Sequence, residues 1–276
     1  MTRQQIGIIG GGNMARAIAG GLIRSGFGAP NILIAEPRSE QREMLRREFP
    51  GAIVTEDNRA VAAGAGNLLL AVKPQILGTV CRELGSAVQK RKPLVISIAA
   101  GPRVADIDAW LGGDLEIVRA MPNQPALVDQ GISALFANER TDELGRVLAE
   151  KVMSAVGNVV WVEDESLLDA VTAVSGTGPA YVYLLLDMMI NSAVELGLSP
   201  HVARTLVLET ARGASALALA ETEPMSSLID RVRSPGGTTT AAFERLEAAD
   251  VRAIFGSAIK AARDRAEALA EEARTN

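Results

Sequence analysis

The chain has 276 residues and a net charge of −5, and 48% of its residues are hydrophobic but only 3% are aromatic. The core must therefore consist of aliphatic side chains, which is typical of parallel sheets and close-packed helices. The acidic balance argues against nucleic acid as a partner, and the single cysteine (Cys81) and single histidine (His201) argue against a disulfide framework, a metal site or a Ser-His-Asp triad.

Up to about residue 162 the sequence alternates short apolar runs with helical patterns. Each apolar run ends at a glycine, a proline or a polar residue, which is typical of strands in a parallel sheet. The predicted strands are 5–9, 32–35, 52–55, 67–71, 94–98 and 115–120, with two added edge strands at 132–136 and 158–162. This order of elements predicts a Rossmann-type, doubly wound, mainly parallel sheet.

After Glu163 the strand signal stops, and helical patterns follow one another along the rest of the chain. The predicted helices are 167–174, 180–196, 200–220, 226–232, 239–247 and 250–274. We therefore predict an α/β domain over residues 1–163 and an all-helical domain over residues 164–276. Alanine is dense at 211–220, and small residues there would allow helices to pack closely within a bundle or across a dimer.

The most apolar predicted helix, at 180–196, bears on localisation. It carries Asp187, Asn191 and Glu195, which a helical spacing of four residues places on one face. A lipid bilayer would not tolerate this polar stripe on an isolated span. Because no signal peptide is recognisable either, we expect a buried amphipathic helix in a soluble, cytoplasmic protein without a membrane partner.

A glycine loop follows the first predicted strand. Gly10, Gly12 and Ala15 fit the pattern G-x-G-x-x-[G/A] between a strand and an amphipathic helix. In this pattern the first glycine permits the tight turn, the second allows a pyrophosphate to approach the backbone, and the third residue allows close helix packing. Free N–H groups at the helix start, where Asn13 and Met14 lie, would bind the phosphates. The loop thus predicts a dinucleotide cofactor.

The end of the second strand bears on which dinucleotide is bound. Glu36 is suited to accept a hydrogen bond from the 2′-hydroxyl of NAD, whereas Arg38 and Ser39 are suited to the 2′-phosphate of NADP. The residues by themselves leave the choice between the two cofactors open.

Three later strands also end in residues suited to a ligand, at the sheet edge where such folds bind their cofactors. The run Ala71-Val72-Lys73-Pro74 would bring a lysine to a phosphate or a ribose. Ala99 and Ala100 would leave room for a nicotinamide ring, and Asn123 offers an amide that could orient a ligand. Together these strand ends predict a binding cleft.

Two glycine-rich segments occur in the helical half, Ser175-Gly176-Thr177-Gly178-Pro179 and Ser234-Pro235-Gly236-Gly237-Thr238-Thr239-Thr240. Each predicts a helix start, where bare N–H groups and hydroxyls can bind an anion such as a carboxylate. The alternative for either segment is a capped helix start without a ligand. Three successive threonines exceed what one cap requires, which favours a ligand at the second segment.

In order and spacing, these motifs resemble those of the pyrroline-5-carboxylate reductases. The resemblance spans nearly the whole chain and is carried by 10–14, Val72-Lys73-Pro74, Met121-Pro122-Asn123, 175–181 and 234–239, although Arg233 stands where a small residue is expected. It implies an N-terminal Rossmann domain, a helical dimerisation domain, and NAD(P)H-dependent reduction of Δ1-pyrroline-5-carboxylate to L-proline. It also implies an active site shared between the subunits of a homodimer, and dimers that can associate into rings.

The resemblance further implies individual roles. It favours NADPH, and thus contacts of Arg38 and Ser39 with the 2′-phosphate, with NADH as the alternative. Asn58 matches a position that contacts the cofactor, and Thr239 matches a threonine beside the ring nitrogen of the substrate. The other implied substrate-binding residues are Glu165, Ser175, Gly176, Glu221, Val232, Gly237 and Thr238.

Two other functions remain as alternatives. A β-hydroxyacid dehydrogenase would use a lysine on the first long helix of the second domain, but residues 163–198 contain no lysine. A non-catalytic NAD(P)-sensing dimer would leave both glycine-rich segments without a task. A reductase of a cyclic imine needs no histidine if the imine arrives protonated. A threonine hydroxyl is a poor acid, so we expect Thr239 to hydrogen-bond the nitrogen.

Overall fold

The computed structural model describes residues 5–275. The chain divides into two compact units, Met1–Thr177 together with Ala262–Asn276, and Gly178–Ala261. The predicted boundary after residue 163 follows the last strand, whereas the first unit continues through the next helical turns. The end of the strand signal and the end of the compact unit are therefore different positions in the chain.

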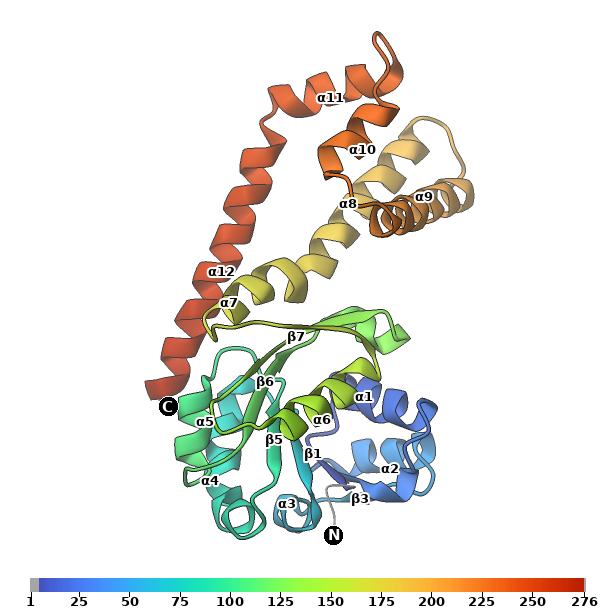
Figure 1. Cartoon of the computed structure of the whole chain (residues 1–276). Helices are drawn as coiled ribbons and strands as arrows, with labels where there is room; N and C mark the ends of the chain where they lie inside the picture. The colour runs from blue at the N-terminus through green and yellow to red at the C-terminus, as the bar shows by residue number, and fades with distance from the viewer. Residues whose placement is uncertain (1–4, 276) are drawn as a thin grey trace. The chain divides into compact units, whose positions relative to one another are not determined.

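The first unit contains an eight-stranded sheet in the order β3-β2-β1-β4-β5-β6-β7-β8 (Figure 1). The strands are β1 (Ile6–Ile9), β2 (Ile32–Ala35), β3 (Ile53–Thr55), β4 (Asn67–Leu70), β5 (Leu94–Ser97), β6 (Ile117–Met121), β7 (Gly131–Ala137) and β8 (Gly157–Trp161). The first six are parallel, β7 runs antiparallel to β6, and β8 runs parallel to β7. This topology confirms the predicted doubly wound sheet with two added strands at one edge.

Helices cover both faces of this sheet (Figure 1). One face packs against α1 (Asn13–Arg24), α2 (Ser39–Glu48) and α6 (Glu143–Ser154), and the other against α3 (Asn58–Gly64), α4 (Pro74–Arg91) and α5 (Val104–Trp110). Ile8 and Ile9 are consecutive in β1, and each is fully buried in a different one of the two apolar clusters. Burial on both faces explains why the inner strands are continuous apolar runs without alternation.

Cys81 lies in α4 and is fully buried in the apolar cluster on that face of the sheet. Burial raises the pKa of its thiol to about 12, so at pH 8 only about one molecule in ten thousand carries the reactive thiolate. We expect a disulfide exchange reagent at pH 8 to leave the folded protein unlabelled and to label one thiol per chain in guanidinium. Labelling of the folded protein at the rate of free cysteine would contradict this burial.

The remaining helices are α7 (Leu167–Val171), a π-helix at Thr172–Gly176, α8 (Gly178–Glu195), α9 (Pro200–Ala220), α10 (Met225–Val232), α11 (Thr238–Ala248) and α12 (Val251–Thr275). Within the second unit α8 packs on α9. In α8 the Asn191 amide donates a hydrogen bond to the Asp187 carboxylate over 3.1 Å, as the four-residue spacing predicts.

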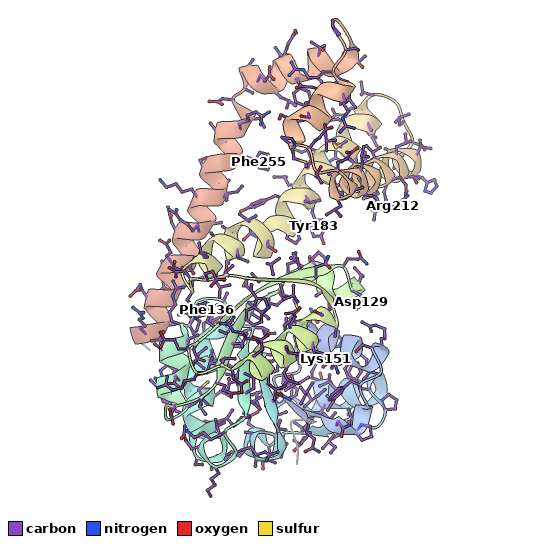
Figure 2. All side chains as sticks on the ribbon, viewed as in Figure 1. Asp129, Phe136, Lys151, Tyr183, Arg212 and Phe255 are labelled. Carbon is purple, nitrogen blue, oxygen red and sulfur yellow. The ribbon has the colours of Figure 1, made fainter. Side chains whose placement is uncertain are left out.

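The apolar surface of α8 is exposed within a single chain. We predicted a buried helix, but none of its residues, all of which the structure describes, is buried. Tyr183, for example, is 52% exposed (Figure 2). By length and composition the stretch Leu167–Glu195 could cross a membrane, but one such helix is weak support for a span. An apolar surface of this extent on a single chain instead suggests that another protein surface covers it.

Candidate active site

Gly10 fixes the course of the chain between β1 and α1. Its φ is +100°, a region that residues with a Cβ rarely adopt. Its N–H donates to the Ala35 carbonyl oxygen over 2.8 Å, and a Cβ at Gly10 would lie 2.7 Å from the Ala71 carbonyl oxygen. The loop is therefore held between the ends of β2 and β4, and only glycine fits there.

Gly12 has a different environment, because, apart from Gly12 and its two chain neighbours, no heavy atom of the described chain lies within 4 Å of where its Cβ would be. It is the N-cap residue of α1. Because glycine has no side chain, no side-chain cap accepts a hydrogen bond from the first-turn N–H groups of this described helix. Asn13 in that first turn is exposed, while Ala15 is buried against the sheet. Open space beside bare N–H groups at a helix start fits a pyrophosphate group.

Glu36, at the end of β2, already has protein partners on both carboxylate oxygens. Oε2 accepts from the Gly11 N–H at 3.0 Å, and Oε1 accepts from the backbone N–H of Arg38 at 3.0 Å and its Nε at 2.9 Å. Burial would raise the pKa of this carboxyl, but the hydrogen bonds from Arg38 and Gly11 outweigh burial and lower the pKa below its ordinary value. Glu36 therefore joins the glycine loop to Arg38, whose side chain is 68% exposed.

Arg42 belongs to the same corner, although the sequence analysis missed it. Its guanidinium donates to the carbonyl oxygens of Glu36 (3.0 Å) and Pro37 (2.6 Å) and pairs with Glu56 at 2.9 Å. Its place in the chain could have indicated it, because Arg42 follows Arg38 by four residues and so lies one turn along α2. The corner thus holds two guanidinium groups and only one buried carboxylate.

The other predicted cofactor residues follow successive parallel strands. Asn58 begins α3 after β3, Lys73 is the exposed N-cap residue of α4 after β4, and Ala99 and Ala100 follow β5. The carboxyl ends of parallel strands share one edge of a sheet, so these residues line the same edge as the glycine loop. Val72 belongs to it as well, because its side chain lies 3.1 Å from a Cβ built at Gly10.

Asn123, after β6, is engaged by the protein itself. Its Oδ1 accepts from the Ile132 N–H at 3.0 Å, and its Nδ2 lies 3.5 Å from the Ser175 Oγ. The amide joins the start of β7 to the π-helix that contains Ser175. Gly176 lies close by as well, since a Cβ on it would approach the Met121 side chain to 2.5 Å.

The first glycine-rich segment contains the predicted helix start, since α8 begins at Gly178, but the chain enters α8 directly from another helical turn. The chain passes from α7 into the π-helix Thr172–Gly176 and then into α8, and the Thr177 N–H donates to the Thr172 carbonyl oxygen at 2.8 Å. The Thr177 hydroxyl donates to the same carbonyl oxygen at 3.0 Å. Because the backbone stays helical, the N–H and the hydroxyl of Thr177 are satisfied within the chain. Turns of π-helix occur frequently at functional sites.

The second glycine-rich segment does open a helix, as predicted. Gly236 has a φ of +69°, the Gly237 N–H donates to the Ser234 carbonyl oxygen at 3.0 Å, and the Thr240 hydroxyl donates to the same oxygen at 2.7 Å. Gly237 is the N-cap residue of α11, and no side-chain cap bonds to this described helix start. The bulky Arg233 turns away from the loop, because it stacks on Phe243 and pairs with Glu247 at 3.0 Å.

The predicted site residues therefore fall into two groups. The first unit holds the cofactor residues together with Glu165, Ser175 and Gly176, and Glu165 accepts from the Val104 N–H at 2.7 Å. The second unit holds Glu221, Val232, Gly237, Thr238 and Thr239. Glu221 pairs with Arg231 at 3.1 Å, next to Val232 in the chain.

A doubly wound sheet with an open glycine loop at its ligand edge, followed by a helical unit, defines a dinucleotide-dependent oxidoreductase. Two family models match, one described as NADP oxidoreductase, coenzyme F420-dependent, over residues 5–101, and one as pyrroline-5-carboxylate reductase dimerisation over residues 165–269. The chain belongs to the pyrroline-5-carboxylate reductase family.

Membership rests on similarity along the whole chain. A pyrroline-5-carboxylate reductase of Pseudomonas aeruginosa is 42% identical over 99% of both chains, and one of Synechocystis is 40% identical over 97% of this chain and 99% of that one. A solved reductase of Coxiella burnetii superposes with a TM-score of 0.89 at 40% identity, covering 96% and 98% of the two chains. A solved Plasmodium falciparum pyrroline carboxylate reductase with NADP bound has a TM-score of 0.87 at 27% identity, with the same coverage. The predicted fold class, family and NAD(P)H-dependent oxidoreductase activity are confirmed.

Proposed function

We propose that this protein is a cytoplasmic homodimer that reduces Δ1-pyrroline-5-carboxylate to L-proline, the last step of proline synthesis, with NADPH as the preferred donor. The observation that carries the proposal is the open, uncapped helix start at Gly12 in a chain related over its full length to pyrroline-5-carboxylate reductases. The exposed apolar surface of α8 and the matching dimerisation model support self-association.

The corner around Glu36 supports the preference for NADPH. A carboxylate selects NAD when it is free to accept from the ribose 2′-hydroxyl, but both oxygens of Glu36 accept from protein donors. Arg38 is exposed beside it, and Ser39 begins α2, so a guanidinium and a helix start converge where a 2′-phosphate would bind. The related P. falciparum enzyme was solved with NADP bound.

Replacement of Arg38 tests this assignment. We expect Arg38→Ala to lower kcat/KM for NADPH about ten-fold, the effect of one lost charge-assisted contact, and to leave that for NADH nearly unchanged. The measurement is the ratio of kcat/KM for the two cofactors, with Arg47→Ala as a control, because Arg47 is exposed on α2 and pairs there with the exposed Glu43. An unchanged ratio in Arg38→Ala would exclude a contact with the 2′-phosphate.

The substrate would bind at the second glycine-rich segment. The bare N–H groups at the start of α11 suit a carboxylate, and the Thr239 hydroxyl suits the ring nitrogen as a hydrogen-bond partner. A bound reduced nicotinamide would supply the hydride to the imine carbon of the protonated substrate, so that the electron pair of the C=N bond stays on a nitrogen that already carries its proton and the product is the secondary amine. The contribution of these residues is positioning, which can account for much of the rate acceleration without a histidine acid.

We place Glu165, Ser175 and Gly176 beside the cofactor and Thr239 on the other half of the site, supplied by the second copy in the dimer. Ser175 and Glu165 are held by residues that follow β6 and β5, the strands next to the nicotinamide position. Glu221, Val232, Gly237 and Thr238 accompany Thr239 in the other half. A ring of such dimers is the larger assembly that we propose.

The direct test is the oxidation of NADPH followed by its absorbance, with Δ1-pyrroline-5-carboxylate as substrate, and then the same assay with NADH. We expect turnover with both cofactors and a higher kcat/KM with NADPH. Tight binding of NADPH without turnover of either cofactor would favour a non-catalytic sensor of the cofactor.

A further inference from the structure

Four charged side chains meet inside the first unit, at the carboxyl edge of β5 and β6. Arg119 lies in β6, Arg103 is the N-cap residue of α5, Glu165 precedes α7, and Asp169 lies in α7. The side chains of Arg119 and Asp169 are only 5% and 4% exposed. Charges buried this deeply require partners, because their desolvation is strongly unfavourable.

The contacts in this cluster converge on one oxygen of Glu165. Its Oε1 accepts from the Arg119 Nη1 at 2.7 Å and from the Val104 N–H at 2.7 Å, while Oε2 has no hydrogen-bond partner among the residues that the structure describes. Arg103 bonds to the Asp169 carboxylate and also approaches the Glu165 carbonyl oxygen at 3.4 Å. The backbone and one oxygen of Glu165 are thus fixed, and its second oxygen is available to a ligand.

The stability of the fold does not by itself explain why a charged arginine is buried at position 119. Its Nε is buried and has no partner within the described part of the chain, and an unsatisfied buried donor is unfavourable. Burial also lowers the pKa of the guanidinium below its ordinary value, against the opposing effect of Glu165. A buried ion pair can often be replaced by apolar residues without loss of stability. A role for the charge itself is therefore the more economical explanation.

The cluster lies where the reaction is expected. Arg119 pairs in register with Ser97, the last residue of β5, and Ala99 and Ala100 follow directly in the chain. Downstream, α7 carries Asp169 and leads into the π-helix that contains Ser175. The two arginines therefore hold Glu165 beside the loop after β5. The pair of Arg103 with Asp169 also fixes the start of the segment that leads to Ser175.

We propose that Arg119 is a positioning residue that acts through Glu165. It holds Oε1 and leaves Oε2 for the nitrogen of the bound imine, where a carboxylate favours the protonated, more electrophilic form of the substrate. This role rests on the proposed function, in which Glu165 contacts the substrate. In this role Arg119 itself touches neither the substrate nor the cofactor. Its replacement should therefore lower kcat/KM for the imine and leave the KM for NADPH unchanged.

A double-mutant cycle with Arg119→Met, Glu165→Gln and the double variant tests this proposal. We expect each single variant to lower kcat/KM for Δ1-pyrroline-5-carboxylate by about ten-fold or more, and the double variant to lose little beyond the larger single effect. The KM for NADPH should stay within about two-fold of wild type, and Arg119→Lys, which keeps one charged donor, should recover part of the loss. Multiplicative losses, or a parallel rise in the KM for NADPH, would overturn the proposal.

Two further results separate the possible failures. If Glu165→Gln alone leaves kcat/KM for the imine unchanged, Glu165 does not contact the substrate and that part of the proposed function fails. If Glu165→Gln is impaired and Arg119→Met is not, the proposed function stands and the role of Arg119 fails. If Arg119→Met does not fold, as judged by its thermal transition, the same cycle is run with Arg119→Lys, and additivity there would equally overturn the proposal.

Discussion

Replacing Thr239 by alanine should lower kcat/KM for Δ1-pyrroline-5-carboxylate by about 10- to 1000-fold, the range for a lost positioning or hydrogen-bonding group. The expectation follows from how rigidly the loop is built. Gly236 at a φ of +69° and two hydrogen bonds to the Ser234 carbonyl oxygen, one of them from Thr240, fix the chain that enters α11. Thr239, half-buried in the first turn, is thereby oriented before the substrate arrives.

The matched control for this prediction is Thr239→Ser, which keeps the hydroxyl and loses only a methyl group. It should retain most of the activity, and both variants should bind NADPH with wild-type affinity by fluorescence titration. Thermal denaturation of the three proteins would show that the loop and α11 remain folded. If Thr239→Ala has the steady-state kinetics of the wild type, Thr239 lies outside the site.

The sheet could be predicted because its burial leaves a direct trace in the sequence. Ile8 and Ile9 are both fully buried although they point to opposite faces, which only an inner strand of a covered sheet allows. The glycine loop could be predicted as well, because the φ of +100° at Gly10 admits few residues other than glycine, and the open space at Gly12 leaves room for a ligand. Such positions depend on the local backbone, which a short motif specifies.

Features that depend on distant or absent partners could not be predicted. The Arg119–Glu165 pair joins residues 46 positions apart, and nothing in either neighbourhood indicates the other. The π-helix at Thr172–Gly176 is distinguished from an α-helix by hydrogen bonds that span five residues, such as the Thr177 N–H to the Thr172 carbonyl oxygen, and no residue type in the segment specifies that spacing. The apolar pattern of α8 predicted a buried helix, but burial depends on what packs against the helix, and the described chain leaves all of its residues unburied.

Glu36 and Arg38 show why the cofactor preference could not be predicted from residue types alone. By residue type the two side chains favour opposite cofactors, and the sequence leaves the choice open. In the structure they are one unit, since Glu36 accepts from the Arg38 side chain at 2.9 Å and from the Gly11 N–H at 3.0 Å. A carboxylate committed to two protein donors orients the arginine and does not compete with it, which the order of residues could not show.

A mixture of two impaired variants should recover activity if each active site takes residues from two copies. The first variant is Gly12→Val, whose Cβ meets no heavy atom of the described chain within 4 Å beyond its chain neighbours, so that it should fit the fold and block the pyrophosphate. The second is Thr239→Ala. In a dimer with one of each, one site carries both lesions and the other carries neither. Random pairing should then give about a quarter of wild-type activity, well above either variant alone.

Placing both lesions in one chain provides the matched control. When the double variant Gly12→Val/Thr239→Ala is co-expressed with the wild type, shared sites leave the mixed dimer inactive, so about a quarter of wild-type activity remains, carried by wild-type dimers. Sites confined to one chain would instead leave about half in this control and no recovery in the mixture of single variants. Shared sites therefore give about a quarter of wild-type activity in both experiments, whereas confined sites give none in the mixture and about half in the control.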